Sequence, residues 1–185
     1  MTKKSLSETG PSPDLSLVGR GADSNGKSIL SSPYKGEVGR GSSLFLSLGS
    51  NLGDRAEILR RAIALINERI GTVLRVSSFI ETEPWGFESE HPFLNAACMV
   101  QTTLSPEQCL EATQQIERDL GRTTKSKDGI YHDRPIDIDL LLYDDITLST
   151  PTLTLPHPRM QERDFVMIPL REIMPIASKT KSQKG

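Results

Sequence analysis

The chain has 185 residues, of which 36% are hydrophobic and 25% are charged, a composition typical of one globular domain with polar tails. Its 22 basic and 24 acidic residues leave a net charge of −2, and no run of about 18 apolar residues occurs. We therefore expect neither nucleic acid nor a membrane as a partner. Two cysteines, Cys98 and Cys109, are too few for a disulfide scaffold. They predict buried thiols in a reducing, cytoplasmic compartment.

Both ends of the chain differ from its middle. Residues 1–42 hold 9 serines, 7 glycines and 3 prolines, too little apolar surface to offset the entropy cost of ordering. We expect a disordered extension at 1–42, a domain at 43–177 and a flexible tail at 178–185.

The 43–177 segment carries a net charge of −7, yet 8 of its 13 cations lie between Arg118 and Arg171. This clustering fits an anion site, or chance clustering on a solvated face.

The predicted elements begin with a strand at 44–48, an apolar run with one polar interruption. A turn at 49–53 leads into a helix that Asp54 caps and Gly71 ends. A second strand, 72–80, is rich in β-branched residues. The later elements are a loop at 81–94, a strand at 95–103, a helix starting at Ser105-Pro106, a loop at 122–134 and a strand at 136–143, followed by turns and short helical pieces to about residue 175.

The order β-α-β-β-α-β predicts an α+β protein with a ferredoxin-like core. In that arrangement a mainly antiparallel sheet is covered on one face by two helices.

The stretch 134–143 alternates aspartates with aliphatic residues. On a strand, Asp137 and Asp139 project from the same face, ~6.7 Å apart. The opposite, buried face would hold Ile136, Ile138, Leu140 and Leu142. Two neighbouring carboxylates repel unless a cation joins them, and hard oxygens beside substrate phosphates suit Mg²⁺, including a pair of ions ~3.5–4 Å apart. The alternative is an exposed acidic strand edge, which the low strand propensity of aspartate disfavours.

The loop before this strand is cationic. Its charged residues include Arg122, Lys125, Lys127 and Arg134. Cations beside a Mg²⁺ site suit phosphoryl transfer, where catalysis is mostly positioning and charge stabilisation, whereas a solvated charged loop is the plainer interpretation. Downstream, His157 and Arg163 are placed to contact phosphate, although a histidine between two prolines is more often a turn residue.

Several segments together carry a resemblance to a known family. They are Leu48–Gly53, Ser77–Phe79, Thr82–Pro84, Phe93–Ala97, Ile116–Glu117, Gly121–Arg122, Arg134–Asp139 and Pro156–Met160. In this order they resemble the 6-hydroxymethyl-7,8-dihydropterin pyrophosphokinases (2-amino-4-hydroxy-6-hydroxymethyldihydropteridine diphosphokinases) of folate biosynthesis. The resemblance runs from about Leu44 to Pro175 and leaves the extension 1–42 outside the family pattern.

The resemblance implies an ATP-dependent diphosphotransferase that acts on the pterin hydroxymethyl group and releases AMP. It implies two Mg²⁺ ions on Asp137 and Asp139, with Arg122 and Arg134 meeting the ATP phosphates. The nucleotide contacts it implies are Gln114, Glu117, Tyr131, Leu140, Thr154, His157 and Arg163. The pterin contacts it implies are Thr82, Trp85, Phe93, Asn95 and Phe165, with the two phenyl rings sandwiching the pterin and the amide bonding its edge. The partners expected are ATP and the pterin, and we expect a monomer.

Two other functions remain open from the residues themselves. One is a different two-metal enzyme on the same core, such as a nucleotidyl transferase or cyclase, which would release pyrophosphate. The other is a non-catalytic module that binds a small metabolite. Such a module has no need of paired strand aspartates beside a cationic loop.

Overall fold

The computed structural model of the chain describes residues 41–123 and 132–175. The predicted tail and nearly all of the predicted extension lie outside these ranges, as do Lys125, Lys127 and Tyr131 of the predicted loop. The described elements are β1 (Ser42–Ser50), α1 (Arg55–Arg69), β2 (Gly71–Val76), β3 (Ile80–Thr82), β4 (Phe93–Thr102), α2 (Pro106–Asp119), β5 (Asp137–Tyr143), β6 (Leu148–Ser149), β7 (Thr154–Leu155), the 3₁₀ helix η1 (Met160–Glu162) and α3 (Asp164–Ile173).

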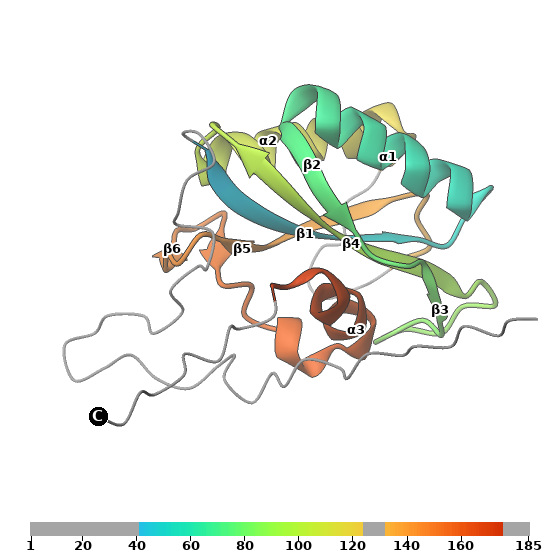
Figure 1. The fold of residues 1–185 in the computed structure, drawn as a ribbon. Helices are drawn as coiled ribbons and strands as arrows, with labels where there is room; N and C mark the ends of the chain where they lie inside the picture. Colours follow the sequence, from blue (N-terminus) through green and yellow to red (C-terminus); the bar gives the residue numbers. More distant parts are fainter. Residues whose placement is uncertain (1–40, 124–131, 176–185) are drawn as a thin grey trace, which may run out of the picture.

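The main sheet has the strand order β2-β4-β1-β5, and short β3 pairs with the start of β4. All of these pairings are antiparallel. Helices α1 and α2 lie together on one face of the sheet (Figure 1). The predicted ferredoxin-like core is therefore confirmed. In the described ranges, no helix combines the length and the apolar character that crossing a membrane requires.

Both core helices begin where the sequence predicts. Asp54 caps α1 by accepting a hydrogen bond from the backbone N–H of Glu57 at 3.0 Å. Ser105 and Gln108 form a reciprocal capping box at α2, with Pro106 in its first turn, where the missing proline N–H costs nothing. Leu59, Ile66 and Ile116 then bury one side of these helices against the sheet.

The predicted strand at 72–80 is wrong as a single element. The pairing of β2 with β4 shifts register between Val73 and Arg75, as at a β-bulge. Beyond β2, Ser77 turns its hydroxyl inward to accept from the backbone N–H of Ala97 at 2.9 Å. The chain then resumes pairing as β3, further along β4.

The other face of the sheet is covered as well, by α3 (Figure 1). Phe45, Met99 and Leu141 of the sheet pack there with Leu170 of α3 in a second apolar core. The sequence predicted helices on one face only, with turns and short helical pieces in this region. Pro169 lies inside α3, and proline opposes a helix interior. The third layer places the N-terminus of α3 near the aspartates of β5.

A register shift in β5 overturns one burial prediction. Leu46 pairs with Leu140 while Phe45 pairs with Leu142, so Leu141 is an extra residue in the ladder. Leu142 consequently packs in the core under α3. Ile136, Ile138 and Leu140 pack under α1 and α2, as predicted.

Candidate active site

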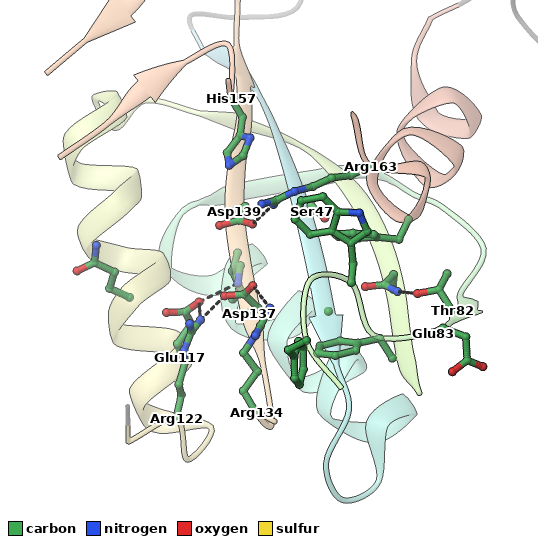
Figure 2. Close-up of a pocket in the computed structure, with 18 of the residues that line it drawn as sticks. Ser47, Thr82, Glu83, Glu117, Arg122, Arg134, Asp137, Asp139, His157 and Arg163 are labelled. Atoms are coloured by element: carbon green, nitrogen blue, oxygen red, sulfur yellow. Dashed lines mark hydrogen bonds and ion pairs between the residues drawn. The ribbon is translucent and has the colours of Figure 1, made fainter. Parts of the chain in front are cut away.

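A cleft of about 320 Å³ opens where β1 and β5 meet the end of α2, the segment after β3 and the start of α3. Its walls carry both signs of charge as well as aromatic rings. Asp137 and Asp139 line it together, as their alternation on the strand predicts. Figure 2 shows arginines converging on these carboxylates from two sides.

Asp137 is engaged by two guanidinium groups. Arg122 donates to its Oδ1, and Arg134 donates to its Oδ2 at 2.9 Å (Figure 2). Burial alone would raise the pKa of Asp137, but the charges of Arg134 and Arg122 hold that pKa below its ordinary value. Asp137 is thus a fully charged carboxylate.

Glu117 is the second acceptor for Arg122, at 2.6 Å, and its side chain is 6% exposed. The same carboxylate oxygen accepts the backbone N–H of Ile138 at 2.8 Å. Because β5 is an edge strand of the sheet that the described residues form, this bond satisfies a donor on its outer edge. Glu117 thereby fixes the end of α2 against β5 and orients Arg122.

Asp139 lies in a different electrostatic setting. Arg163 approaches it with Nη1 at 3.9 Å from Oδ2, beyond hydrogen-bond reach. Burial, followed by the charge of Asp137, raises the pKa of Asp139 to about 7. Its side chain nevertheless keeps 38% of its surface exposed. Within the described ranges, Asp139 is therefore less fully compensated by positive charge than Asp137.

His157 stands above Asp139 in the same cleft (Figure 2). Burial, followed by the charge of Arg163, lowers the pKa of His157, so the imidazole is neutral near pH 7. Its Nδ1 accepts the backbone N–H of Arg159 at 3.3 Å. The proton of the neutral ring therefore sits on Nε2, which makes that nitrogen a hydrogen-bond donor.

The opposite end of the cleft combines an amide side chain with aromatic rings. Asn95 donates to the hydroxyl of Thr82 at 2.9 Å, which fixes the amide. Gly49 faces that amide across β1 and β4: a Cβ there would lie 2.9 Å from the Asn95 Oδ1 and 3.6 Å from the Phe93 ring. The space beside the amide thus depends on the missing side chain of Gly49.

Aromatic rings form the walls at this end. Phe93 packs edge-on against Phe87, with centroids 6.2 Å apart, and Phe165 packs against Trp85 at 6.3 Å. The guanidinium of Arg134 lies 5.1 Å from the centroid of the Phe93 ring. Phe93 and Phe165 both line the cleft, and each is held by another ring.

The turn after β1 joins two of the segments that wall the cleft. Asn51, buried at 3% exposure, donates to Asp133 at 2.6 Å and to the His91 carbonyl at 3.2 Å. The side-chain Oδ1 of Asn51 accepts the backbone N–H of Arg134 at 2.8 Å. Arg55 adds a bond to the Pro92 carbonyl at 2.7 Å. The segment after β3 and the approach to β5 are therefore tied to one corner.

The donor set fits Mg²⁺ only with help from a ligand. Among the described residues, no group of three or more histidine, cysteine or acidic side chains is arranged around one point. Two carboxylates still suffice for Mg²⁺, because this ion commonly keeps waters and takes substrate phosphates as its other ligands. The raised pKa of Asp139 marks the place where added positive charge is most favourable.

The chain has clear relatives. The pattern of the family described as 7,8-dihydro-6-hydroxymethylpterin-pyrophosphokinase (HPPK) matches residues 45–175. The chain belongs to this family. The 2-amino-4-hydroxy-6-hydroxymethyldihydropteridine pyrophosphokinase of Porphyromonas gingivalis is 54% identical over 133 residues, 71% of this chain and 90% of that protein. The protein of the same name from Bacillus subtilis is 47% identical over 130 residues, 70% of this chain and 76% of that protein.

Solved structures support the fold. The Plasmodium falciparum HPPK-DHPS crystal structure with SDX-DHP aligns with a TM-score of 0.59 at 16% identity, covering 76% of this chain. The match spans only 42% of that longer chain. Family membership confirms the prediction of an ATP-dependent pyrophosphokinase, and the structural match confirms the predicted HPPK-like fold.

Most residues that the family resemblance singled out do meet in the cleft. These are Thr82, Trp85, Phe93, Asn95, Gln114, Glu117, Arg122, Arg134, Asp137, Asp139, His157, Arg163 and Phe165. Leu140 instead packs in the core, so only its main chain is available to a nucleotide. Thr154 lies exposed in β7, and Tyr131 falls outside the described residues.

Sequence reasoning missed other residues of the pyrophosphokinase cleft. The walls also include Ser47, Gly49, Glu83, Phe87, Leu110 and Ile138. Of these residues, Ser47 and Gly49 could have been found from the sequence. They are two positions apart on a predicted strand, so they belong to the same face. The signal was weak because the turn motif Gly49–Gly53 is too generic to indicate a site.

Proposed function

We propose that the protein transfers the diphosphate of ATP to the hydroxymethyl oxygen of 6-hydroxymethyl-7,8-dihydropterin, releasing AMP, as a step of folate biosynthesis. The observation that carries this is the pairing of Asp137 and Asp139 on one strand face inside a cleft, with three arginines in reach of them. A triphosphate needs this density of compensating charge. The other end of the cleft offers an amide and two phenyl rings, which suit a flat, uncharged pterin.

Asp137 and Asp139 would hold Mg²⁺, as two ions together with the ATP phosphates. When bound, the ions neutralise phosphate charge and align the attacking and leaving oxygens. The support lies in the unequal pair: Asp137 is ionised by its arginines, and the raised pKa of Asp139 falls once a cation neutralises the pair. Binding of Mg²⁺ would therefore release a proton from Asp139 near pH 7.

Arg122 and Arg134 would stabilise the charge that moves between phosphates during transfer. Both are held within the cleft, with side chains 9% and 13% exposed. In a site screened from water, guanidinium groups act strongly on developing charge. Because Glu117 also binds Arg122, that arginine has a fixed anchor when phosphate draws it from Asp137.

The remaining assignments divide the cleft in two. The nucleotide would contact Gln114, Glu117, His157 and Arg163, with further contacts to the Leu140 main chain, Thr154 and Tyr131. The pterin would contact Thr82, Trp85, Phe93, Asn95 and Phe165. The neutral His157, with its proton on Nε2, suits a hydrogen bond to a phosphate oxygen.

We also propose a single catalytic domain at 43–177 that acts as a monomer in the cytoplasm. Both cysteines are buried and unpaired, which fits a reducing compartment. Residues 1–40 of the extension 1–42 and the tail 178–185 would be dispensable because their composition offers little to bury, whereas Ser42 begins β1. Deleting residues 1–40 should leave turnover unchanged and shift the melting temperature by no more than a degree or two, whereas loss of most activity would place that segment in the working enzyme.

The reaction is tested by separating the products of ATP, Mg²⁺ and 6-hydroxymethyl-7,8-dihydropterin by chromatography. The expected result is one AMP and one pterin diphosphate for each ATP consumed, and none when the pterin or Mg²⁺ is left out. A nucleotidyl transferase or cyclase on this core would release pyrophosphate instead. A metabolite-binding module would consume no ATP at all.

A further inference from the structure

Two arginines lie over one indole at the edge of the cleft. The guanidinium carbon of Arg159 is 4.7 Å from the ring centroid of Trp85, and that of Arg163 is 4.9 Å away. Trp85 belongs to the segment after β3, whereas the arginines flank η1. This contact therefore joins two cleft walls that lie more than 70 positions apart in the sequence.

The ring supports Arg163, whose charge is buried. Its side chain is 9% exposed, and Asp139 stands off at 3.9 Å. Two aromatic faces lie near its guanidinium, Trp85 at 4.9 Å and Phe165 at 5.7 Å. The negative faces of aromatic rings attract a cation, and most strongly Trp, when water is excluded. Trp85 is the nearer of the two rings to Arg163.

Arg159 is fixed from its other side. Its Nε lies 3.3 Å from the Oε2 of Glu162, and its side chain is 49% exposed. An exposed ion pair of this kind contributes little to stability, but it directs where the guanidinium stands. The contacts thus run in sequence from Glu162 through Arg159, Trp85 and Arg163 to Asp139.

We propose that Trp85 is a positioning residue for ATP binding: its indole holds Arg163 beside Asp139, and Arg159 holds the indole. This rests on the proposed function, and it assigns Trp85 a role toward the nucleotide as well as toward the pterin. Phosphates that bind Arg163 place negative charge beside the indole that holds this arginine. The environment of Trp85 therefore changes when ATP binds, before any pterin is present.

Substitutions at Trp85 distinguish a role in ATP binding from a role in pterin binding. Trp85→Leu should raise the KM for ATP about tenfold, the scale of a desolvated cation–π contact, and Trp85→Phe should restore most of the loss. The matched control is Phe87→Leu, in the same segment, whose ring contacts Phe93 and should affect pterin binding instead. If Trp85→Leu raised only the KM for the pterin, the positioning role would be wrong.

A second readout needs no turnover. Trp85 is the sole tryptophan of the chain, so fluorescence excited at wavelengths that tyrosine does not absorb reports on it alone. Adding a non-hydrolysable ATP analogue with Mg²⁺ should change the emission of the unmodified protein and of Arg60→Ala, a control on α1 that pairs with Glu57. Arg163→Ala should abolish the change, and Arg159→Ala should shift the emission of the ligand-free protein.

The two hypotheses can fail separately. If the unmodified protein forms no AMP, the proposed function is wrong, whatever the emission does. If it forms AMP while Arg163→Ala gives the same emission change as the unmodified protein, the reaction stands and the role of Trp85 is overturned. Melting curves of each variant show that a loss is not one of folding, and retained activity in Trp85→Phe makes the same point.

Discussion

Arg134 donates a hydrogen bond to Asp137 at 2.9 Å, so a predicted phosphate-binding cation contacts a predicted metal ligand directly. Arg122 binds the other oxygen of the same carboxylate. Among the described residues, Asp139, two positions away, forms a longer ion pair, with Arg163 at 3.9 Å. The two carboxylates therefore contribute differently to the stability of the fold, although they share a strand face and a proposed function.

Replacing each aspartate by asparagine should abolish turnover but affect stability in opposite directions. Loss of either carboxylate should lower kcat by about 10³-fold or more, because metal-assisted charge stabilisation is worth several kcal/mol. Without metal, Asp137→Asn should destabilise the fold by roughly 1.5–3 kcal/mol, the range for hydrogen bonds to charged groups. Asp139→Asn should stabilise it by removing repulsion. Near-normal activity of the double variant in Mg²⁺ would rule out the metal role.

The stabilising effect of Asp139→Asn should depend on pH. The folded-state pKa of Asp139 is raised to about 7 from an ordinary 3.8, so the folded protein holds a proton that the unfolded chain loses between these values. Stability contributed by that proton is complete below about pH 4 and is lost as the pH rises through 7. The melting temperature of Asp139→Asn, measured with EDTA, should thus match the unmodified protein at pH 4 and exceed it at pH 8. The same difference at both values would contradict this assignment.

Arg122→Ala and Arg134→Ala should impair the chemical step more than binding of the pterin. Their guanidinium groups meet charge that shifts during transfer, an interaction strongest in the transition state. Each loss should lower kcat by about 10²–10³, the usual effect of removing one such donor. Steady-state kinetics with both substrates varied provide the measurement. A higher KM for the pterin with kcat unchanged would mean that the arginine was misplaced.

ATP with Mg²⁺ should bind before the pterin binds tightly. The Arg134 guanidinium lies 5.1 Å from the centroid of the Phe93 ring, in the region where a stacked pterin would lie. Phosphates draw it away, which opens the ring face. Calorimetric titration should show pterin affinity rising by about five- to 150-fold, the usual range of site coupling, with a non-hydrolysable ATP analogue and Mg²⁺. Arg134→Ala should lessen this dependence, and equal affinity with and without the analogue would refute the order of binding.

Gly49→Ala should weaken pterin binding selectively. The added Cβ would lie 2.9 Å from the Asn95 Oδ1, closer than a carbon and an oxygen can approach without displacement. Overpacking of this kind costs about 1–3 kcal/mol, which should appear in the dissociation constant of the pterin and not in that of ATP. In a background of Asn95→Ala the same change should have little further effect. Additive losses would place Gly49 outside the pterin end of the cleft.

The features predictable from sequence were those set by local chemistry. The proline and glutamine after Ser105 define a helix start in any context, and the two-residue spacing of Asp137 and Asp139 places them on one face of any strand. The family resemblance added the residues that gather around them from distant elements.

The features that the sequence did not predict depend on contacts between separate helices and strands. Leu142 faces α3 because a bulge forms against β1, and nothing in β5 itself encodes that shift. The helix at Asp164–Ile173 forms in spite of Pro169 because its apolar side buries against the sheet. The stacking of Arg159 and Arg163 on Trp85 arises only when two separate cleft walls meet.

The central claim is that a diphosphate moves as one unit onto the pterin. It is tested most directly with ATP radiolabelled at its β-phosphorus, incubated with Mg²⁺, the pterin and the protein. The account predicts that the label appears in the pterin product at the rate at which unlabelled AMP forms, and that Asp137→Asn prevents both. Label in free pyrophosphate or in ADP would contradict it.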